Sequence, residues 1–517
     1  MIENSKTDAD EVKNMHWSEI LAKKIAAERK PPFVVAAGIT PSGPVHPGTL
    51  CEFLFAQAVA KELGPHGKVH YVFISDDMDA LDSVPEPLKE YAATINEDMG
   101  MPLCLARDPK GCHASFAEHF IAETQNIMKI FGVKVEFLRA SELYAAGKYD
   151  EYAKLLCERK DEVKEVVRAS SNRDVMPADW FPIMPLCEKC KNVEKVDAAS
   201  GKKRGNTVLE YKDGAYKYRC SKCGYEGNDT IAAHHYKLLF RLDWATRQKF
   251  LNVVVEGGSV DHHSPGGTLS TVIAIRRKIY NEEPPFLYKF GLLKYKGKKY
   301  SKSKGIGHTV NELLTLAPVA VIKYVLLRPD VQEDKELVID KDTLFVLLDD
   351  FKKASQLAKS SESMSRPDRK KAIAFELCDA GAVWTADPSD LVLYYNIYGD
   401  WKKAGELAGD AAGVKMLEPY LKVWLEKQLV PDKYMFKLAY NKAAVTPLVE
   451  KYLAALKPGM SAEDIHNLAF TVAQESGAQG KDVFKQMYNW LIAADMGPRL
   501  GKLIFAIGVE KVKAAGE

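Results

Sequence analysis

The sequence predicts an α/β protein with a parallel sheet that is split by an inserted domain and followed by an all-helical domain. Three observations lead to this fold class. A strand-helix-strand pattern lies near the N-terminus, a similar pattern resumes after about residue 250, and strand signals fade after about residue 345. With 517 residues the chain is several times longer than a usual single domain, so we expect more than one packed core.

The first pattern begins with a short apolar run, residues 32–37, which predicts a buried strand. A segment rich in turn residues follows, from Gly38 to Pro44, and then an apolar, helix-like run over residues 50–63. Residues 69–74 form a second apolar run typical of a strand. Together these segments predict a β-α-β unit, whose strands are parallel.

The second pattern consists of a predicted strand at residues 253–255, a turn-rich Glu256-Gly-Gly258 and a helix-like run over residues 269–280. We therefore predict one nucleotide-binding fold that is divided between residues 1–94 and 241–305. An inserted domain, residues 95–240, lies between the two parts, and a linker, residues 306–345, follows the second part.

Residues 346–517 predict a separate helical domain, because helical periodicity dominates there. Examples are the runs at residues 391–395, 416–421 and 465–473. Ser461-Ala-Glu-Asp464 has the pattern of a helix N-cap.

Composition limits the class of protein. Apolar residues make up 46% and charged residues 27% of the chain, which is typical of globular proteins. A net charge of +2 neither favours nor excludes nucleic-acid binding, since local basic patches would suffice. No apolar run reaches the roughly 18 residues that a membrane span requires, and the charged first residues lack the apolar core of a signal peptide. We expect a cytoplasmic protein.

Four of the nine cysteines form two Cys-x-x-Cys pairs, Cys187 with Cys190 and Cys220 with Cys223. This spacing lets two thiolates bind one tetrahedral ion, so we predict a single structural zinc site with four thiolate ligands. A redox pair is the alternative for a lone Cys-x-x-Cys. Residues 208–211 and 216–218 around Asp213-Gly214 predict a hairpin of a zinc ribbon. The single cysteines are expected to be small buried side chains: Cys51, Cys104, Cys112, Cys157 and Cys378.

Two segments have the chemistry of a phosphate site. His46-Pro-Gly-Thr49 lies at a strand-to-helix junction, where the helix dipole and backbone N–H groups favour phosphate. Lys299-Tyr-Ser-Lys-Ser-Lys-Gly305 places cations and hydroxyls on a loop that could close over a triphosphate. Each segment alone is more often a surface loop.

Taken together, the two segments resemble the HIGH and KMSKS motifs of class I aminoacyl-tRNA synthetases. Further segments are similar to class I lysyl-tRNA synthetases, and the similarity extends from about residue 15 to the C-terminus. These segments are Thr40-Pro-Ser-Gly-Pro-Val-His46, Ser75-Asp-Asp-Met-Asp79, Trp180-Phe-Pro-Ile183, the two Cys-x-x-Cys pairs, Asp243-Trp-Ala-Thr-Arg247, Asp261-His262, Gly266-Gly267 and Gly497-Pro-Arg-Leu-Gly501.

This resemblance implies a Rossmann-type catalytic domain with an inserted zinc-binding domain, a linker that contacts the tRNA stem, and a C-terminal anticodon-binding domain. It implies ATP-dependent aminoacylation of tRNA(Lys) with lysine through a lysyl-adenylate, with Mg²⁺ beside ATP and structural Zn²⁺. Three positions depart from the family motifs, Pro47, Thr49 and Tyr300. Proline is tolerated at a helix start, so we expect Pro47 to change ATP affinity more than catalysis.

The predicted site residues fall into three groups. Catalysis is assigned to His46, Gly48, Thr49, Lys299 and Lys302. ATP is expected to contact these residues together with Ser301 and Ser303. We expect His46 and Thr49 to contact the ATP phosphates, and Lys299 and Lys302 to neutralise the β- and γ-phosphates as pyrophosphate leaves.

The substrate's ammonium needs a carboxylate or oriented dipoles, because it loses water on binding. Asp77 and Asp79 follow the second strand at the carboxyl edge of the sheet, where ligands bind in such folds. Helix capping is their alternative role. By resemblance, Gly38 and Thr40 would hold the substrate's backbone groups, and Trp244 and His262 would line its pocket, although core packing of Trp244 and a structural role for His262 remain open.

Three other functions are compatible with parts of the sequence. A glutamyl- or glutaminyl-type enzyme of the same class should present an arginine to its acidic substrate, which Asp76-Asp-Met-Asp79 disfavours. A paralogue that binds tRNA without charging it would not need His46, Gly48, Lys299 and Lys302, and a simple zinc-ribbon nucleic-acid binder would need neither ATP motif.

Overall fold

The computed structural model describes residues 15–172, 174–197, 200–301 and 306–516. The chain forms two compact units. The first contains Met1–Val310, Val325–Leu337 and Ser365–Lys370, and the second contains Asn311–Tyr324, Val338–Met364 and Lys371–Glu517. In the described ranges no single helix is long and apolar enough to cross a membrane; one bent pair, Val310–Leu316 and Val319–Leu327, meets the length and composition criteria jointly.

The first unit contains a five-stranded sheet in the order β12-β11-β1-β2-β3, and all neighbouring strands are parallel. The predicted α/β class with a parallel sheet is therefore confirmed. In the sheet β1 lies between β2 on one side and β11 on the other, so the strand order reverses beside β1. The crevice at such a switch point is where ligands bind in sheets of this kind. The strands are β1 (Phe33–Ile39), β2 (Val69–Ser75), β3 (Glu136–Arg139), β11 (Val255–Ser259) and β12 (Phe286–Phe290).

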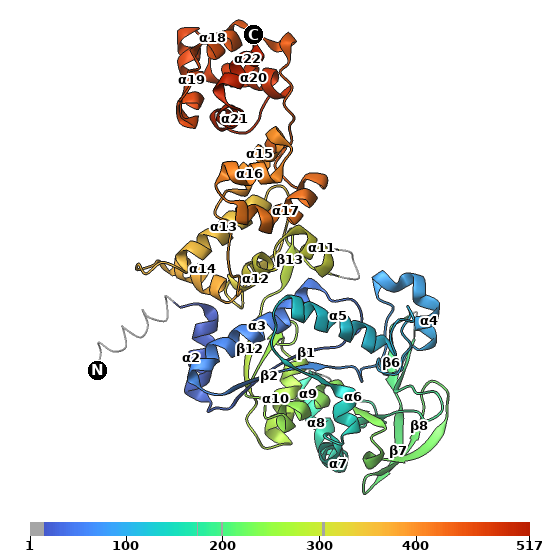
Figure 1. The fold of residues 1–517 in the computed structure, drawn as a ribbon. Coiled ribbons are helices and arrows are strands. Elements are labelled where there is room, and N and C mark those ends of the chain that lie inside the picture. The colour runs from blue at the N-terminus through green and yellow to red at the C-terminus, as the bar shows by residue number, and fades with distance from the viewer. Residues whose placement is uncertain (1–14, 173, 198–199, 302–305, 517) are drawn as a thin grey trace, which may run out of the picture. The chain divides into compact units, whose positions relative to one another are not determined.

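Helices cover both faces of this sheet. Figure 1 shows α3 and α5 on one side of the parallel strands and α9 and α10 on the other. Gly38 in β1 lies so close to β2 that a Cβ atom there would be 2.6 Å from the carbonyl oxygen of Ile74, which explains a glycine inside a buried strand. The helices are α2 (Trp17–Glu28), α3 (Pro47–Leu63), α5 (Phe116–Ile130), α9 (Phe240–Phe250) and α10 (Thr268–Lys278).

The predicted strands at residues 32–37 and 69–74 and the predicted helices at 50–63 and 269–280 are confirmed as β1, β2, α3 and α10. The strand predicted at residues 253–255 is shifted toward the C-terminus, because β11 begins at Val255 and ends at Ser259. Gly257 and Gly258 extend this strand because the ring of Tyr288 covers Gly257, where a Cβ atom would be 2.5 Å from the ring.

Residues 136–139, which lie within the predicted insertion, form β3 of the parallel sheet. This strand is only four residues long, is at the sheet edge and is not fully buried, so it lacks an apolar run. The predicted domain boundaries themselves stay a prediction.

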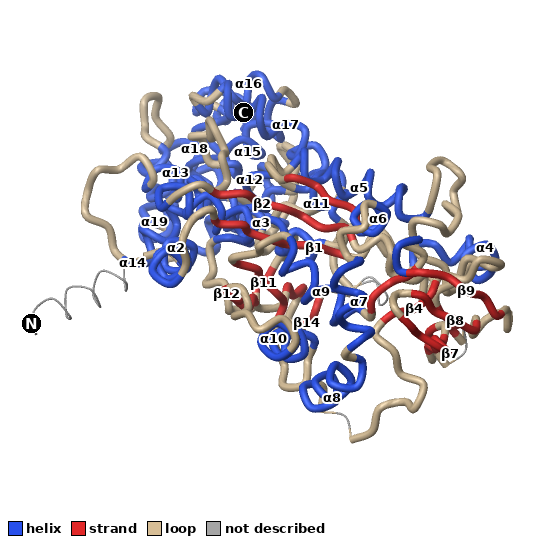
Figure 2. The backbone as a smooth tube through the Cα atoms, turned by 90° about the horizontal axis from the view of Figure 1, so that it is seen from below, coloured by secondary structure: helices blue, strands red, loops and turns tan. Residues whose placement is uncertain are grey.

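The rest of the inserted region contains short antiparallel sheets, and Figure 2 shows their strands set apart from the parallel strands. The predicted hairpin is confirmed, with Asp213 (φ 51°) and Gly214 (φ 87°) at a turn that needs left-handed backbone. The strands are β4 (Ile183–Pro185), β5 (Glu194–Val196), β6 (Lys203–Gly205), β7 (Thr207–Lys212), β8 (Ala215–Arg219), β9 (Glu226–Thr230) and β10 (Tyr236–Leu238). The helices of this region are α6 (Ala140–Ala145), α7 (Asp150–Glu158), α8 (Lys160–Ser170) and η3 (Ile231–Ala233), and η2 (Glu86–Tyr91) and α4 (Ala92–Glu97) lead into it.

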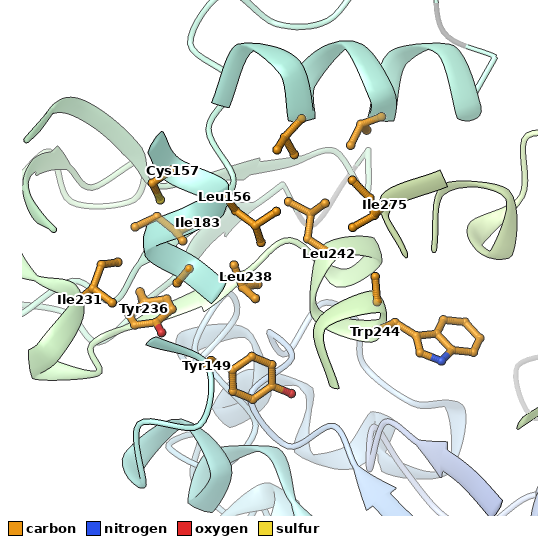
Figure 3. Packing of buried hydrophobic residues seen from close by; sticks show 14 of the residues in the cluster. Tyr149, Leu156, Cys157, Ile183, Ile231, Tyr236, Leu238, Leu242, Trp244 and Ile275 are labelled. Carbon is orange, nitrogen blue, oxygen red and sulfur yellow. The ribbon is translucent and has the colours of Figure 1, made fainter. Parts of the chain in front are cut away.

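One apolar core joins this region to α9 and α10. Leu156 of α7 and Ile183 of β4 pack in the same cluster as Leu242 of α9 and Ile275 of α10 (Figure 3). Trp244 belongs to this cluster, so α9 is anchored by its apolar face. The other elements of the first unit are η1 (Gly64–His66), β13 (Leu293–Tyr295), β14 (Lys298–Lys299) and β15 (Lys335–Glu336).

The second unit is built from helices around a core that includes Trp490 and Tyr452. The predicted cap is confirmed, because Ser461 and Asp464 form a capping box at the start of α19. The helices after β14 are α11 (Val310–Leu316), α12 (Val319–Leu327), α13 (Leu344–Leu357), α14 (Arg366–Glu376), α15 (Pro388–Tyr398), α16 (Trp401–Ala408), α17 (Ala411–Glu426), η5 (Asp432–Tyr434), η6 (Lys442–Ala444), α18 (Pro447–Ala455), α19 (Ala462–Glu475), α20 (Gly480–Ile492), α21 (Leu500–Ile507) and α22 (Val509–Gly516); α11, α12 and α14 have residues in both units.

Candidate functional site

The N-terminus of α3 is built from the first predicted phosphate segment. His46 is the N-cap residue, and its Nδ1 accepts a hydrogen bond from the backbone N–H of Gly48 at 3.0 Å. In a neutral ring with this tautomer the proton lies on Nε2, which can donate to an anion. Pro47 occupies the first helical position, where no backbone N–H is needed. The departure at Pro47 therefore fits the helix start.

A cavity of about 220 Å³ brings the two predicted phosphate segments together although they lie some 250 residues apart in the sequence. One wall comes from the start of α3, and the other from residues 290–293 together with the first two residues of the second motif, Lys299 and Tyr300. The lining residues are Ile39, His46, Gly48, Thr49, Cys51, Glu52, Ser259, Asp261, Phe290, Gly291, Leu292, Leu293, Lys299 and Tyr300. The cavity thus lies at the carboxyl ends of β1 and β11, beside the switch point.

Tyr300, which stands where the family motif has methionine, connects the two walls. Its side chain is buried, its hydroxyl donates to the carbonyl of Leu337 at 2.7 Å, and its ring meets the His46 ring edge-on at a centroid distance of 5.7 Å. Gly307 has φ +92°, and a Cβ there would lie 2.1 Å from the Tyr300 ring. Ser301 pairs with Ile306, while Lys302 and Ser303 lie outside the described residues.

Lys299 extends from β14 toward the cavity and is exposed. Its Nζ lies 2.5 Å from Oδ2 of Asp261, which is also exposed. Burial lowers the pKa of neighbouring His262, and the charge of Lys299 adds to this shift while Asp261 opposes it. Because both partners are solvated, an incoming phosphate can replace the Asp261 carboxylate at small cost.

The acidic segment after β2 is already paired within the protein. Asp77 accepts both the backbone N–H (2.7 Å) and the hydroxyl (2.5 Å) of Ser141 in the first turn of α6. The N-cap residue of that helix, Arg139, provides no side-chain cap, so Asp77 supplies it from a neighbouring element. Burial raises the pKa of Asp77, and the Ser141 bonds oppose this shift.

Asp79 and Asp76 each have a cationic partner. Asp79 accepts from the hydroxyl of Thr40 at 2.6 Å and pairs with the ammonium of Lys237 at 2.9 Å. Asp76 pairs with the guanidinium of Arg247, which is buried with it. Lys237 could not be predicted as a partner of these carboxylates, because nothing in the sequence pattern places β10 beside the end of β2.

Trp244, His262 and Glu256 form a contiguous group. The indole of Trp244 meets the ring of His262 perpendicularly at a centroid distance of 5.3 Å, and its Nε1–H donates to Oε2 of Glu256 at 2.9 Å. Gln248 donates to the same oxygen at 2.6 Å. The structure thus brings the predicted residues Trp244 and His262 together. Glu256 was missed, and its one signal was a lone carboxylate after three valines.

The four predicted metal ligands converge. The Sγ atoms of Cys187 and Cys223 are 3.7 Å apart, those of Cys190 and Cys220 are 3.5 Å apart, and all four lie within 4.8 Å of one another. Edges of about 3.8 Å are expected for a tetrahedron with Zn–S bonds of about 2.3 Å. The left-handed residues Lys191 (φ 59°) and Gly224 (φ 72°), each one position after a pair, turn the chain around the thiolates.

A second group of possible metal ligands was not predicted. Asp108, Cys112, His113 and His119 place one ligand atom each within 4.8 Å of the others. The Sγ atom of Cys112 is 3.2 Å from Nδ1 of both histidines. The expectation that Cys112 is a small buried side chain was wrong, because it is exposed. The signal in the sequence was the spacing Asp-x-x-x-Cys-His-x-x-x-x-x-His.

Comparison with known families gives one match. The model of the family described as tRNA synthetases class I (K) matches residues 15–379.

Several proteins of known function are similar over nearly the whole chain. A lysine–tRNA ligase from Archaeoglobus fulgidus is 29% identical over 96% of this chain and 99% of its own length. The lysine–tRNA ligase of Methanocaldococcus jannaschii is 28% identical over 96% and 98%, and that of Pyrococcus horikoshii is 27% identical over 95% and 97%. Among solved structures, a glutamate tRNA ligase from Elizabethkingia meningosepticum aligns with 94% of this chain and 98% of its own, at 11% identity and a TM-score of 0.40.

Proposed function

The chain belongs to the family of class I (K) tRNA synthetases, and on this premise we propose that it uses ATP to ligate lysine to tRNA(Lys) through a lysyl-adenylate. The observation that supports this function most strongly is the shared cavity, in which His46 and Thr49 face the same space as Lys299. Similarity to lysine–tRNA ligases over nearly their full length supports the choice of amino acid.

In the first step the lysine carboxylate attacks the α-phosphorus of ATP, and pyrophosphate leaves. The protein contributes positions and charge, and no covalent enzyme intermediate is needed. We assign the ATP contacts to His46, Gly48 and Thr49 at the N-terminus of α3, where the helix dipole favours phosphate. The Nε2–H of His46 and the hydroxyl of Thr49 are the donors that this helix start provides.

We assign to the second motif the neutralisation of the negative charge that builds on pyrophosphate. Lys299 and Lys302 would neutralise the β- and γ-phosphates, and Ser301 and Ser303 would donate hydrogen bonds to them. Mg²⁺ would supply further charge neutralisation when it enters with ATP, and the cavity provides the carboxylate of Asp261 as an oxygen ligand of the kind it prefers.

In the second step the 3′-terminal hydroxyl of tRNA attacks the carbonyl of the adenylate, the ester bond to lysine forms, and AMP leaves. We assign residues 346–517 to anticodon binding and residues 306–345 to the tRNA stem. Helices rich in lysine and arginine can bind phosphates, and exposed aromatic side chains can stack on unpaired bases.

The lysine pocket is assigned to Gly38 and Thr40 for the substrate's backbone groups and to Trp244 and His262 for its side chain. Asp77 and Asp79 are the carboxylates that were predicted from the sequence to bind the ammonium of the substrate lysine. The close approach of β2 to Gly38 and the contact of Trp244 with His262 are consistent with a narrow pocket at the ends of β1 and β11.

We further propose two structural metal sites in the inserted region. Cys187, Cys190, Cys220 and Cys223 fit zinc by donor type and by spacing. Asp108, Cys112, His113 and His119 mix one carboxylate, one thiolate and two imidazoles, a donor set that suits zinc as well. Each site would fix loops that have little regular structure of their own.

Charging of tRNA tests the proposal. The purified chain, incubated with ATP, tRNA and radiolabelled amino acid, should attach lysine and not glutamate to tRNA. His46→Ala should reduce charging strongly, while Lys89→Ala, at an exposed lysine of η2 outside the cavity, serves as the control. Charging with glutamate would indicate the glutamyl-type alternative, and tRNA binding without charging would indicate a non-charging paralogue.

A further inference from the structure

The ammonium of a bound lysine side chain must regain in the pocket the stabilisation that it loses with its water. A carboxylate that already has a cation beside it provides less of this compensation than one without. The pairing state of each carboxylate near the switch point therefore indicates which one can accept the substrate.

The carboxylates after β2 have partners that compensate their charge. Asp76 faces Arg247, Asp79 faces Lys237, and Asp77 accepts two hydrogen bonds from Ser141 at a helix N-terminus. Asp243, nearby on α9, pairs with Lys237 as well and accepts hydrogen bonds from two tyrosines. Asp77 alone of these four has no cation beside it, but each of its two oxygens accepts a hydrogen bond at the N-terminus of α6.

Glu256 differs from them. It is 3% exposed, and the hydrogen bonds from Trp244 and Gln248 both end on Oε2. Within the described ranges no basic side chain lies within 4 Å of its carboxylate, and no donor reaches Oε1. Burial raises the pKa of Glu256, and the charge of Arg247 and the two hydrogen bonds oppose the shift without removing it. A cation is what this carboxylate lacks.

The position of Glu256 matches the length of a lysine side chain. Glu256 lies opposite Ala36 in the register of β1 and β11, two residues before the level of Gly38. Two residues along a strand span about 7 Å, and an extended lysine side chain spans about 6 Å from Cα to Nζ. A substrate whose backbone groups lie near Gly38 and Thr40 would thus place its ammonium at the depth of Glu256, beside the Trp244 indole.

We propose that Glu256 is the residue that binds the ε-ammonium of the substrate lysine and so determines the choice of amino acid. Trp244 positions the carboxylate through its indole N–H and covers the methylene groups of the substrate with its ring. Asp79 and Lys237 then form a supporting ion pair, and Asp77 is a helix cap. This inference rests on the proposed function and adds to it the side chain that recognises the ammonium of the substrate.

The test compares Glu256→Gln with wild type in lysine-dependent pyrophosphate exchange, with tRNA present. The variant keeps the shape and the acceptor for Trp244 but loses the charge, so KM for lysine should rise by about 30-fold or more, with KM for ATP within about threefold of wild type. Asp98→Asn is the control, since Asp98 is also a buried carboxylate and its partner is Arg107, which belongs to neither proposed site. It should leave both constants unchanged.

A second measurement separates recognition of the ammonium from a structural role. 2-Aminohexanoic acid is lysine with a hydrogen atom in place of the ε-ammonium group, and it should inhibit wild type about 100-fold more weakly than lysine binds. In Glu256→Gln this ratio should fall to about tenfold or less, because the variant no longer distinguishes the two groups by charge. A variant that is merely misfolded would lose both ligands equally, and the ratio would stay.

The outcomes are distinct. A near-normal KM for lysine in Glu256→Gln, or an unchanged ratio between the two ligands, overturns the inference. So does a large rise in KM for lysine in Asp79→Asn with none in Glu256→Gln. If Glu256→Gln does not fold, Glu256→Asp withdraws the carboxylate by one methylene group, and its preference should move toward homolysine; no such shift overturns the inference too. If wild type shows no lysine-dependent exchange, the proposed function itself fails.

Discussion

The indole N–H of Trp244 donates to Glu256 at 2.9 Å, and the same indole stands perpendicular to the ring of His262 at 5.3 Å. One aromatic side chain therefore joins a buried carboxylate to the loop that carries Asp261. Since Asp261 pairs with Lys299, this contact links the proposed lysine pocket to the proposed phosphate site.

Lysine binding should weaken as pH falls. Glu256 must be ionised to pair with an ammonium, and burial raises its pKa, so protonation begins at a higher pH than for an exposed glutamate. Arg247, Gln248 and Trp244 face the carboxylate and oppose this shift. KM for lysine, measured between about pH 6 and 8, should rise toward the acidic end, while KM for ATP changes less.

The pH profile has a control of its own. Glu256→Gln cannot ionise at this position, so its KM for lysine should be high throughout and should lose the part of the pH dependence that comes from Glu256. A variant that retains the full wild-type slope would show that another group titrates.

Asp77→Ala should lower the stability of the protein and leave substrate binding nearly unchanged. The carboxylate caps α6 through the N–H and hydroxyl of Ser141, and loss of a cap costs about 1–2 kcal/mol of the free energy of unfolding. Denaturant unfolding measures this loss, and exchange assays measure KM for lysine. A tenfold rise in KM for lysine in this variant would indicate that Asp77 binds the substrate.

Purified protein should contain two zinc ions per chain. Cys223→Ser should remove one and His119→Ala the other, because the two sites share no ligand. Metal analysis by mass spectrometry gives the number directly. A content of one that falls to zero in Cys223→Ser and stays at one in His119→Ala would eliminate the second site, and zinc-free protein with four titratable thiols would eliminate both.

Lys302→Ala should lower the rate of adenylate formation by more than about tenfold with little change in lysine binding, because its charge matters most as pyrophosphate departs. Single-turnover measurement of the adenylate gives this rate. Lys298→Ala provides the control, since Lys298 is an exposed residue of β14 next to the motif. Normal kinetics in Lys302→Ala would remove this residue from the mechanism.

The parts of the fold that the sequence predicted are those with a strong local signal. Residues 32–37, 50–63 and 69–74 have the apolar periods of a strand, a helix and a strand, and their burial is set by the same residues. The edge strand β3 was missed because its four residues have no such period. Gly257 suggested a turn, whereas packing under Tyr288 keeps it in β11.

The candidate site also has residues with a local sequence signal and residues without one. His46, Thr49 and Lys299 were predicted as site residues from local motif spacing, and the cavity brings them together. Glu256 could not be found, since its importance depends on which carboxylates already have cations. That pairing is made by Lys237 with Asp79 and by Arg247 with Asp76, and in each pair the two residues are more than 150 positions apart in the sequence.

Amino-acid-dependent exchange of pyrophosphate into ATP, measured with wild-type protein in the presence and in the absence of tRNA, tests the central claim most directly. It reports formation of the adenylate and the identity of the amino acid in one reaction. Our account predicts exchange that depends on lysine and is absent with glutamate, at least when tRNA is present. Exchange that depends on glutamate and ignores lysine, or no exchange with either amino acid under both conditions, would contradict it.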